Sequence, residues 1–146
     1  MREYIHNVYR IFETIEELAV EHAKIFDQLE SELNELRKNP KNENLYNNIL
    51  RRTKKLRAIR ARLKRALRKL NDVSSANHEA KVLQDIATLS EYMVIVGFYQ
   101  ERALLEELAE MSREANLPHH QTMFEEDLRE LDDLTRMLET IIDKYY

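Results

Sequence analysis

The stretch NNILRRTKKLRAIRARLKRALRKL, residues 47–70, decides the fold because two patterns run through it together. Apolar side chains recur every seven residues, at Ile49, Leu56, Leu63 and Leu70. A seven-residue repeat keeps one apolar seam of a helix facing its partners and favours left-handed packing at about 20°. The same stretch carries eleven Lys and Arg and no acidic residue, although the whole chain has a formal charge of -4. The sequence therefore predicts a long amphipathic helix with a basic surface.

Similar repeats fill the rest of the chain between three turn-forming stretches: KNPKNEN (38–44), NDVSSAN (71–77) and ANLPHH (115–120). Pro40 cannot continue a helix, while Asn116 and Pro118 suit the end of one helix and the start of the next. The predicted helices cover about 3–38, 44–71, 77–115 and 118–145. Four such helices with short connections predict a single all-α domain over residues 1–146, an antiparallel up-down-up-down four-helix bundle.

Composition narrows the class of protein further. The chain has no Cys, one Gly and two Pro, which excludes disulfides and thiolate metal sites and disfavours β-rich folds. Its N-terminus lacks the apolar core of a signal peptide, and its most apolar run, MVIVGFY at 93–99, is too short to span a bilayer. We expect a soluble, cytoplasmic protein without a transmembrane segment.

Charge is distributed unevenly along the chain. Residues 41–72 have a net charge of +10, whereas residues 1–40, 73–116 and 117–146 have net charges of -4, -5 and -5. Cations that flank the apolar seam can be neutralised by the acidic helices beside them. A further set, called here the outward row, is expected to point away from the other helices: Arg51, Lys54, Arg57, Lys64, Arg65 and Arg68. Within the predicted helix over 44–71, none of these has an acidic residue three or four positions away, so the row predicts an anionic partner.

Three kinds of partner fit such a row: the acidic face of another protein or a second copy, a nucleic acid, or an anionic membrane surface. The acidic remainder of the chain would repel a polyanion, and no aromatic residue interrupts the Lys and Arg run to stack on bases. We therefore favour a homo-oligomer or an acidic protein partner, with nucleic acid as the less favoured alternative.

His22 interrupts an otherwise apolar seam. A buried neutral imidazole needs a hydrogen-bond partner, and antiparallel packing places Gln100, Tyr99 and Arg60 within reach. One interpretation is a small polar pocket for a ligand or metal. The other is a core histidine that is satisfied by its neighbours and fixes the register of the helices.

The run MVIVGFY is apolar around the whole helix and contains the single glycine, Gly97. A glycine inside a helix costs about 1 kcal/mol relative to alanine, and it usually accompanies close backbone approach, a ligand or a π-bulge. We predict that Val94, Ile95 and Phe98 form a homo-oligomer interface; the alternative is that the same chain covers them.

Residues 99–142 resemble a helical hairpin of the ferritin-like superfamily, in its small bacterial stress-protein branch. The residues that carry the resemblance are Tyr99, Glu101, the LLEELAEM run, Ala115, Pro118, FEEDL and RMLE at 136–139. It implies a bundle with metal ligands, in which Asp127 and Leu134 stand where the branch has histidines and Glu101 and Glu126 are the remaining carboxylates. His22 is a further candidate ligand. The only Glu-x-x-His pair is Glu3–His6, near the N-terminus, and residues 44–71 have no interior carboxylate.

The function predicted from the sequence is a non-catalytic binding or assembly protein that acts through charged helix faces and self-associates, without a cofactor. One alternative is a ferritin-like metal-binding protein with an atypical or degenerate site. A second is a nucleic-acid-associated bundle that uses the basic helix.

Overall fold

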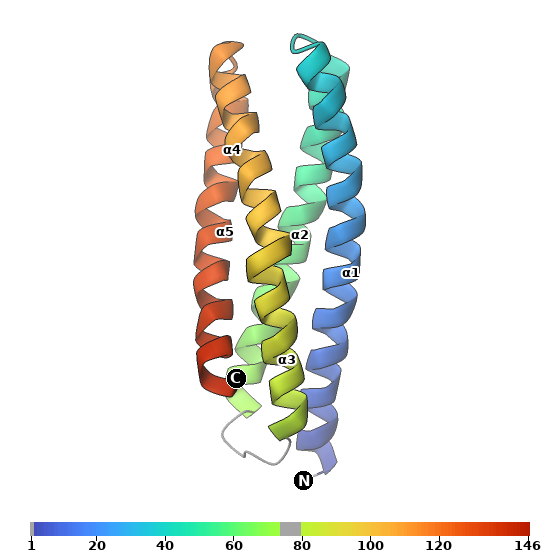
Figure 1. The fold of residues 1–146 in the computed structure, drawn as a ribbon, viewed down its shortest axis with the longest axis vertical. Coiled ribbons are helices and arrows are strands. Elements are labelled where there is room, and N and C mark those ends of the chain that lie inside the picture. The colour runs from blue at the N-terminus through green and yellow to red at the C-terminus, as the bar shows by residue number, and fades with distance from the viewer. Residues whose placement is uncertain (1, 74–79) are drawn as a thin grey trace.

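The computed structural model describes residues 2–73 and 80–146, with side chains described for 7–72 and 80–146. Its elements are α1 (Arg2–Lys38), α2 (Glu43–Val73), α3 (Ala80–Tyr92), the π-helical turn η2 (Met93–Gly97), α4 (Phe98–Glu114) and α5 (Pro118–Tyr145). Because α3, η2 and α4 follow one another without a break, they form one rod, and four rods run antiparallel (Figure 1). The prediction of an all-α four-helix bundle is confirmed; residues 77–79, predicted to begin the third helix, lie outside the described residues.

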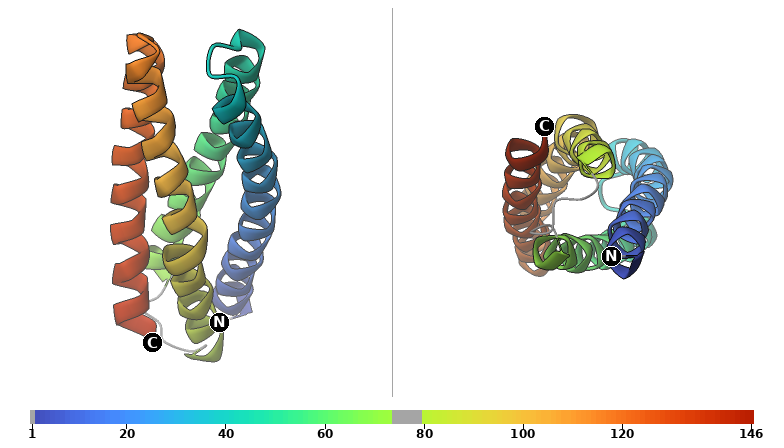
Figure 2. Two further views of the ribbon diagram at one scale, coloured as in Figure 1. Left: turned by 45° about the horizontal axis from the view of Figure 1, so that its top comes forward. Right: turned by 90° about the horizontal axis from the view of Figure 1, so that it is seen from below.

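The rods form two helical hairpins that pack on each other. α1 packs along α2, and the rod formed by α3, η2 and α4 packs along α5. Seen end-on, the rods stand at the corners of a square, with α2 between α1 and α5 and diagonally opposite the third rod (Figure 2). The outer side of the basic helix is therefore left without a neighbouring rod.

Local sequence explains both described connections. The Asn42 side chain accepts hydrogen bonds from the backbone N–H groups of Asn44 and Leu45 at 3.0 and 3.2 Å and so caps the start of α2. Asn116 has φ of 62°, and the N–H of Leu117 donates to the carbonyl of Ser112 at 2.8 Å. This left-handed helix end, followed by Pro118 as the first residue of α5, is the arrangement expected from the sequence.

The predicted seams lie in the core. Ile49, Leu56, Leu63 and Leu70 of α2 are fully buried and face apolar residues of the other rods. Each rod also places one of four polar or charged side chains that meet in this core: His22 from α1, Arg60 from α2, Glu101 from α4 and Asp127 from α5. The bundle thereby collects four such groups that are far apart in the sequence.

The turn η2 sets which residues of the third rod face inward. The N–H of Phe98 donates to the carbonyl of Met93, five residues back, so the turn holds one more residue than an α-helical turn. Met93 and Phe98 are both buried as a result. Gly97 therefore lies in a π-helical turn, which is one of the three situations expected for it.

None of the helices in the described residues combines the length and the apolar composition that crossing a membrane requires.

Candidate functional site

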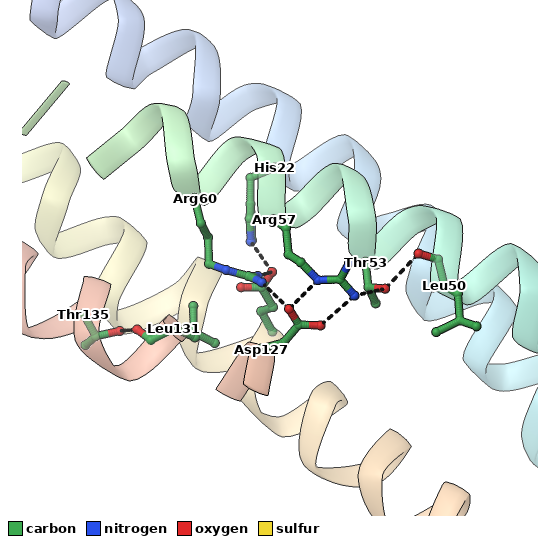
Figure 3. Close-up of polar contacts among 9 residues, drawn as sticks. His22, Leu50, Thr53, Arg57, Arg60, Asp127, Leu131 and Thr135 are labelled. Atoms are coloured by element: carbon green, nitrogen blue, oxygen red, sulfur yellow. Dashed lines mark hydrogen bonds and ion pairs between the residues drawn. The ribbon is translucent and has the colours of Figure 1, made fainter. Parts of the chain in front are cut away.

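The most distinctive feature of the interior is a layer of charged side chains, called here the charged layer: His22, Arg57, Arg60, Glu101 and Asp127. Figure 3 shows Arg57 and Arg60 reaching from α2 towards Asp127, with His22 beside them. Apart from Arg57, every member is at most 4 % exposed. Such groups are found in protein interiors only when they are paired or hydrogen-bonded.

Arg60 connects three rods. Its Nη1 donates to Glu101 Oε1 at 3.1 Å and its Nη2 donates to Asp127 Oδ1 at 2.7 Å. Arginine suits this place because one planar group presents several donors in fixed directions. The long side chain of α2 thus ties its own hairpin to α4 and α5 of the other.

Arg57 forms a second bridge to the same carboxylate. Its Nε and Nη2 donate to Asp127 Oδ1 and Oδ2 at 2.7 and 3.2 Å, and its Nη2 also donates to Thr53 Oγ1 at 3.4 Å. The expectation that Arg57 points away from the other helices is therefore wrong. The physical reason is Asp127, because a buried carboxylate stabilises a two-pronged contact with a guanidinium group.

Charge balances within the layer. Two guanidinium groups face two carboxylates, so the ionised forms sum to zero when His22 is neutral. Burial raises the pKa of Asp127 above its ordinary value, and the hydrogen bond from Arg57 and the charge of Arg60 oppose that rise. The positive charges of the two arginines therefore offset the free-energy cost of burying the two carboxylates.

His22 lies at the edge of the charged layer. Its Nε2 is 3.7 Å from Glu101 Oε1, too far for a hydrogen bond, and its ring meets the Phe98 ring edge-on with centroids 5.3 Å apart. Within the described residues, His22 Nε2 and Glu101 Oε2 have no hydrogen-bond partner. Gly97 lies against the other side of the imidazole ring. A Cβ atom added at Gly97 would be 3.5 Å from His22 Cε1.

The structure separates the residues predicted to share a polar pocket with His22. Gln100 and His22 both line a cavity of about 230 Å³ between α1 and η2. Tyr99 is 69 % exposed and lies outside it, and Arg60 pairs with Glu101 instead. The extra residue in η2 explains the difference, because it turns Phe98 and Glu101 inward and Tyr99 outward.

A metal centre does not fit the side chains that meet here. Of the predicted ligands, His22 and Glu101 reach the core, but Glu126 is exposed and its neighbour Asp127 points inward instead. Both buried carboxylates already accept hydrogen bonds from guanidinium groups, whose positive charge opposes a metal cation. Within the described residues, no group of three or more His, Asp or Glu is arranged to hold a metal ion. Glu3 and His6 lie outside the described side chains.

The outward row is only partly as predicted. Arg51, Lys54, Arg65 and Arg68 are exposed, Lys64 is half-buried, and Arg57 has turned inward. Neighbouring cations of α2 do pair across helices, because Arg52 reaches Glu32 at 2.9 Å and Arg62 reaches Glu21 at 3.6 Å. By contrast, nothing within the described part of the chain forms a hydrogen bond or ion pair with Lys54, Arg65 or Arg68.

The three residues predicted to form an oligomer interface differ in how exposed they are. Ile95 is 60 % exposed, Val94 is half-buried against the core, and Phe98 is 2 % exposed in contact with His22. Phe98 therefore cannot belong to a surface, and its inclusion is wrong. Tyr92 and Tyr99 are exposed instead, three residues before and four after Ile95.

The sequence analysis named Asp127 only through the ferritin-like resemblance, although the spacing of the chain indicates that it is buried. Phe124, Asp127, Leu131 and Leu134 follow the alternating spacing of three and four residues that marks one helix face. Arg60 follows the same spacing on its helix, four residues after Leu56 and three before Leu63. A charged residue at such a position predicts a buried charge that needs a partner on another helix.

A scan against protein-family models and searches of curated proteins and of solved structures find no match to this chain. The resemblance to the ferritin-like superfamily stays a prediction, because none of these comparisons tests it.

Proposed function

We propose that this protein is a non-catalytic helical bundle that assembles with copies of itself through charged helix faces. The observation that supports this most is the contrast between its two sets of cations. Inside, Arg57 and Arg60 are matched by the two carboxylates of Glu101 and Asp127. Outside, Lys54, Arg65 and Arg68 have no acidic partner in the described part of the chain.

A second copy of the chain can supply acidic partners for these cations. Residues 1–40, 73–116 and 117–146 are each net negative, and α1 exposes Glu13, Glu16 and Glu17 close together. Contact between the basic face of one copy and an acidic face of the next pairs opposite charges and uses two different surfaces. Each exposed pair contributes little, so this assembly depends on several pairs together and weakens as salt is added.

The third rod, diagonally opposite α2 (Figure 2), adds exposed apolar side chains to the surface that would receive the basic face of the next copy. Tyr92, Ile95 and Tyr99 are spaced by three and four residues along the third rod and are 50 %, 60 % and 69 % exposed. Exposed aromatic and aliphatic side chains flanked by charges are typical of the central part of protein interfaces.

Charge reversal tests the proposal. Lys54→Glu with Arg68→Glu removes two cations of the outward row, and the matched control Lys24→Glu with Arg129→Glu reverses one Lys and one Arg on the acidic helices α1 and α5. Light scattering coupled to size exclusion at low salt should show a lower mass for the first variant than for the control. Equal masses for wild type and both variants would contradict assembly through this face.

The two alternative functions stay predictions, and a separate measurement tests each of them. Salt-dependent retention of RNA or DNA that is lost in Lys54→Glu with Arg68→Glu would favour a nucleic-acid-associated bundle. Stoichiometric iron or manganese in purified protein would favour the ferritin-like alternative.

A further inference from the structure

A groove between α1 and α2 combines a defined volume with a concentration of positive charge. It measures about 560 Å³ and is lined by Asn7, Arg10, Ile11, Thr14, Arg62, Arg65, Ala66, Lys69 and Asp72. Four of these nine residues are cations and one is acidic. The groove lies further towards the C-terminal end of α2 than Lys54 and away from the charged layer. It shares Arg65 with the outward row, whereas Arg10, Arg62 and Lys69 lie outside that row.

The cations come from two helices and face one hollow. Arg62, Arg65 and Lys69 are spaced by three and four residues on α2, and Arg10 approaches from α1. Seven helical residues span about 10 Å, so the three α2 cations line one wall of roughly that length. Only Arg62 has an acidic partner, the half-exposed Glu21 at 3.6 Å, among the described residues. The groove therefore keeps an excess of positive charge.

The floor of the groove is made by smaller and less polar side chains. Ala66 and Ile11 are almost fully buried beneath it, and Thr14 and Asn7 supply neutral hydrogen-bonding groups. The short side chain of Ala66 between the longer ones of Arg62 and Lys69 is what makes the surface concave at this point. A volume of this size matches small-molecule sites, which span about 300 to 1,000 Å³.

We infer that this groove binds the polyphosphate group of a small anion. Guanidinium groups present paired donors that match phosphate oxygens, and an ammonium group adds a mobile point charge. A row of cations about 10 Å long, facing a second helix, matches the length of a short chain of phosphates. The groove shares Arg65 with the proposed self-association, whereas Arg10 and Lys69 belong to the groove alone and so allow the two to be tested separately.

Calorimetric titration of the whole protein with tripolyphosphate, and separately with ATP, tests the inference at low salt. The groove variant is Arg10→Gln with Lys69→Gln, and the control is Arg68→Gln with Lys54→Gln, which removes the same two residue types from the outward row. All four substituted residues are exposed, so circular dichroism should confirm unchanged helix content. We expect binding to wild type and control, and a loss of about tenfold or more in the groove variant.

Each outcome has a defined meaning. Tighter binding of ATP than of tripolyphosphate, with loss in the groove variant, supports a nucleoside polyphosphate as the ligand; equal binding supports the polyphosphate group alone. Equal losses in both variants would show that only general charge attraction is at work and would overturn the inference. It would also be overturned by the absence of any binding to wild type, or by an RNA oligonucleotide that binds more tightly than either probe and depends on Lys54 and Arg68.

Discussion

Replacing Arg60 by methionine tests the charged layer most sharply, because the new side chain keeps much of the volume and removes the charge. The change deletes the 3.1 Å bond to Glu101 and the 2.7 Å bond to Asp127. Asp127 keeps both bonds from Arg57, but the fully buried Glu101 is left with only His22 at 3.7 Å. One buried carboxylate thus loses its cation, and breaking such a pair costs about 3–5 kcal/mol.

Urea unfolding followed by circular dichroism measures this loss, and thermal unfolding should show a midpoint lower by roughly 6–20 °C for a chain of this size. The double variant Arg60→Met with Glu101→Gln removes both charges and should recover most of the stability. A loss below about 1 kcal/mol for Arg60→Met, or no recovery in the double variant, would refute this reasoning.

Three further predictions concern local features. Gly97→Ala should stabilise the protein by up to about 1 kcal/mol in urea unfolding, because its Cβ would meet His22 Cε1 at an ordinary 3.5 Å; a marked loss would show that η2 requires glycine. Burial and the charge of His119 lower the pKa of His120, so the stability that His120 contributes is present above its unfolded pKa of about 6.5 and is lost as the pH falls through its folded value. His120→Gln should therefore flatten the decline in stability between pH 7 and pH 5 more than His119→Gln does, and equal profiles would contradict this. Asn116→Ala should lower the free energy of unfolding by about 1–2 kcal/mol because φ is 62° there, whereas Asn116→Gly should be tolerated; equal losses for the two would speak against the left-handed helix end.

The helices and most of the core could be predicted from the sequence because both follow from one repeat. The apolar residues of α2 and α5 keep a constant spacing, and burial follows that spacing from end to end. The third rod is different, since η2 contains one extra residue that changes which side faces the core. The sequence analysis therefore placed Tyr99 beside His22 and Phe98 on the surface, whereas Phe98 is buried and Tyr99 is exposed.

The charged layer was harder to predict because its members depend on one another. Arg57 lies at the margin of the buried face of α2, where a cation is as compatible with solvent as with the core. Only the position of Asp127, seventy residues further on, turns Arg57 inward. The spacing of apolar residues along one helix shows which of its positions are buried. Which side chains pair between two helices depends on how far one helix is shifted along the other, and the sequence does not state that shift.

The central claim is that Lys54, Arg65 and Arg68, which have no acidic partner among the described residues, hold copies of this chain together. Sedimentation equilibrium of the wild-type protein across salt concentrations tests it most directly, because the Debye length falls from roughly 30 Å at about 0.01 M salt to roughly 3 Å at about 1 M. We expect a mass at low salt that is a multiple of the 17.5 kDa of one chain, and a return towards 17.5 kDa as salt is added. A mass of 17.5 kDa at every salt concentration would contradict the claim.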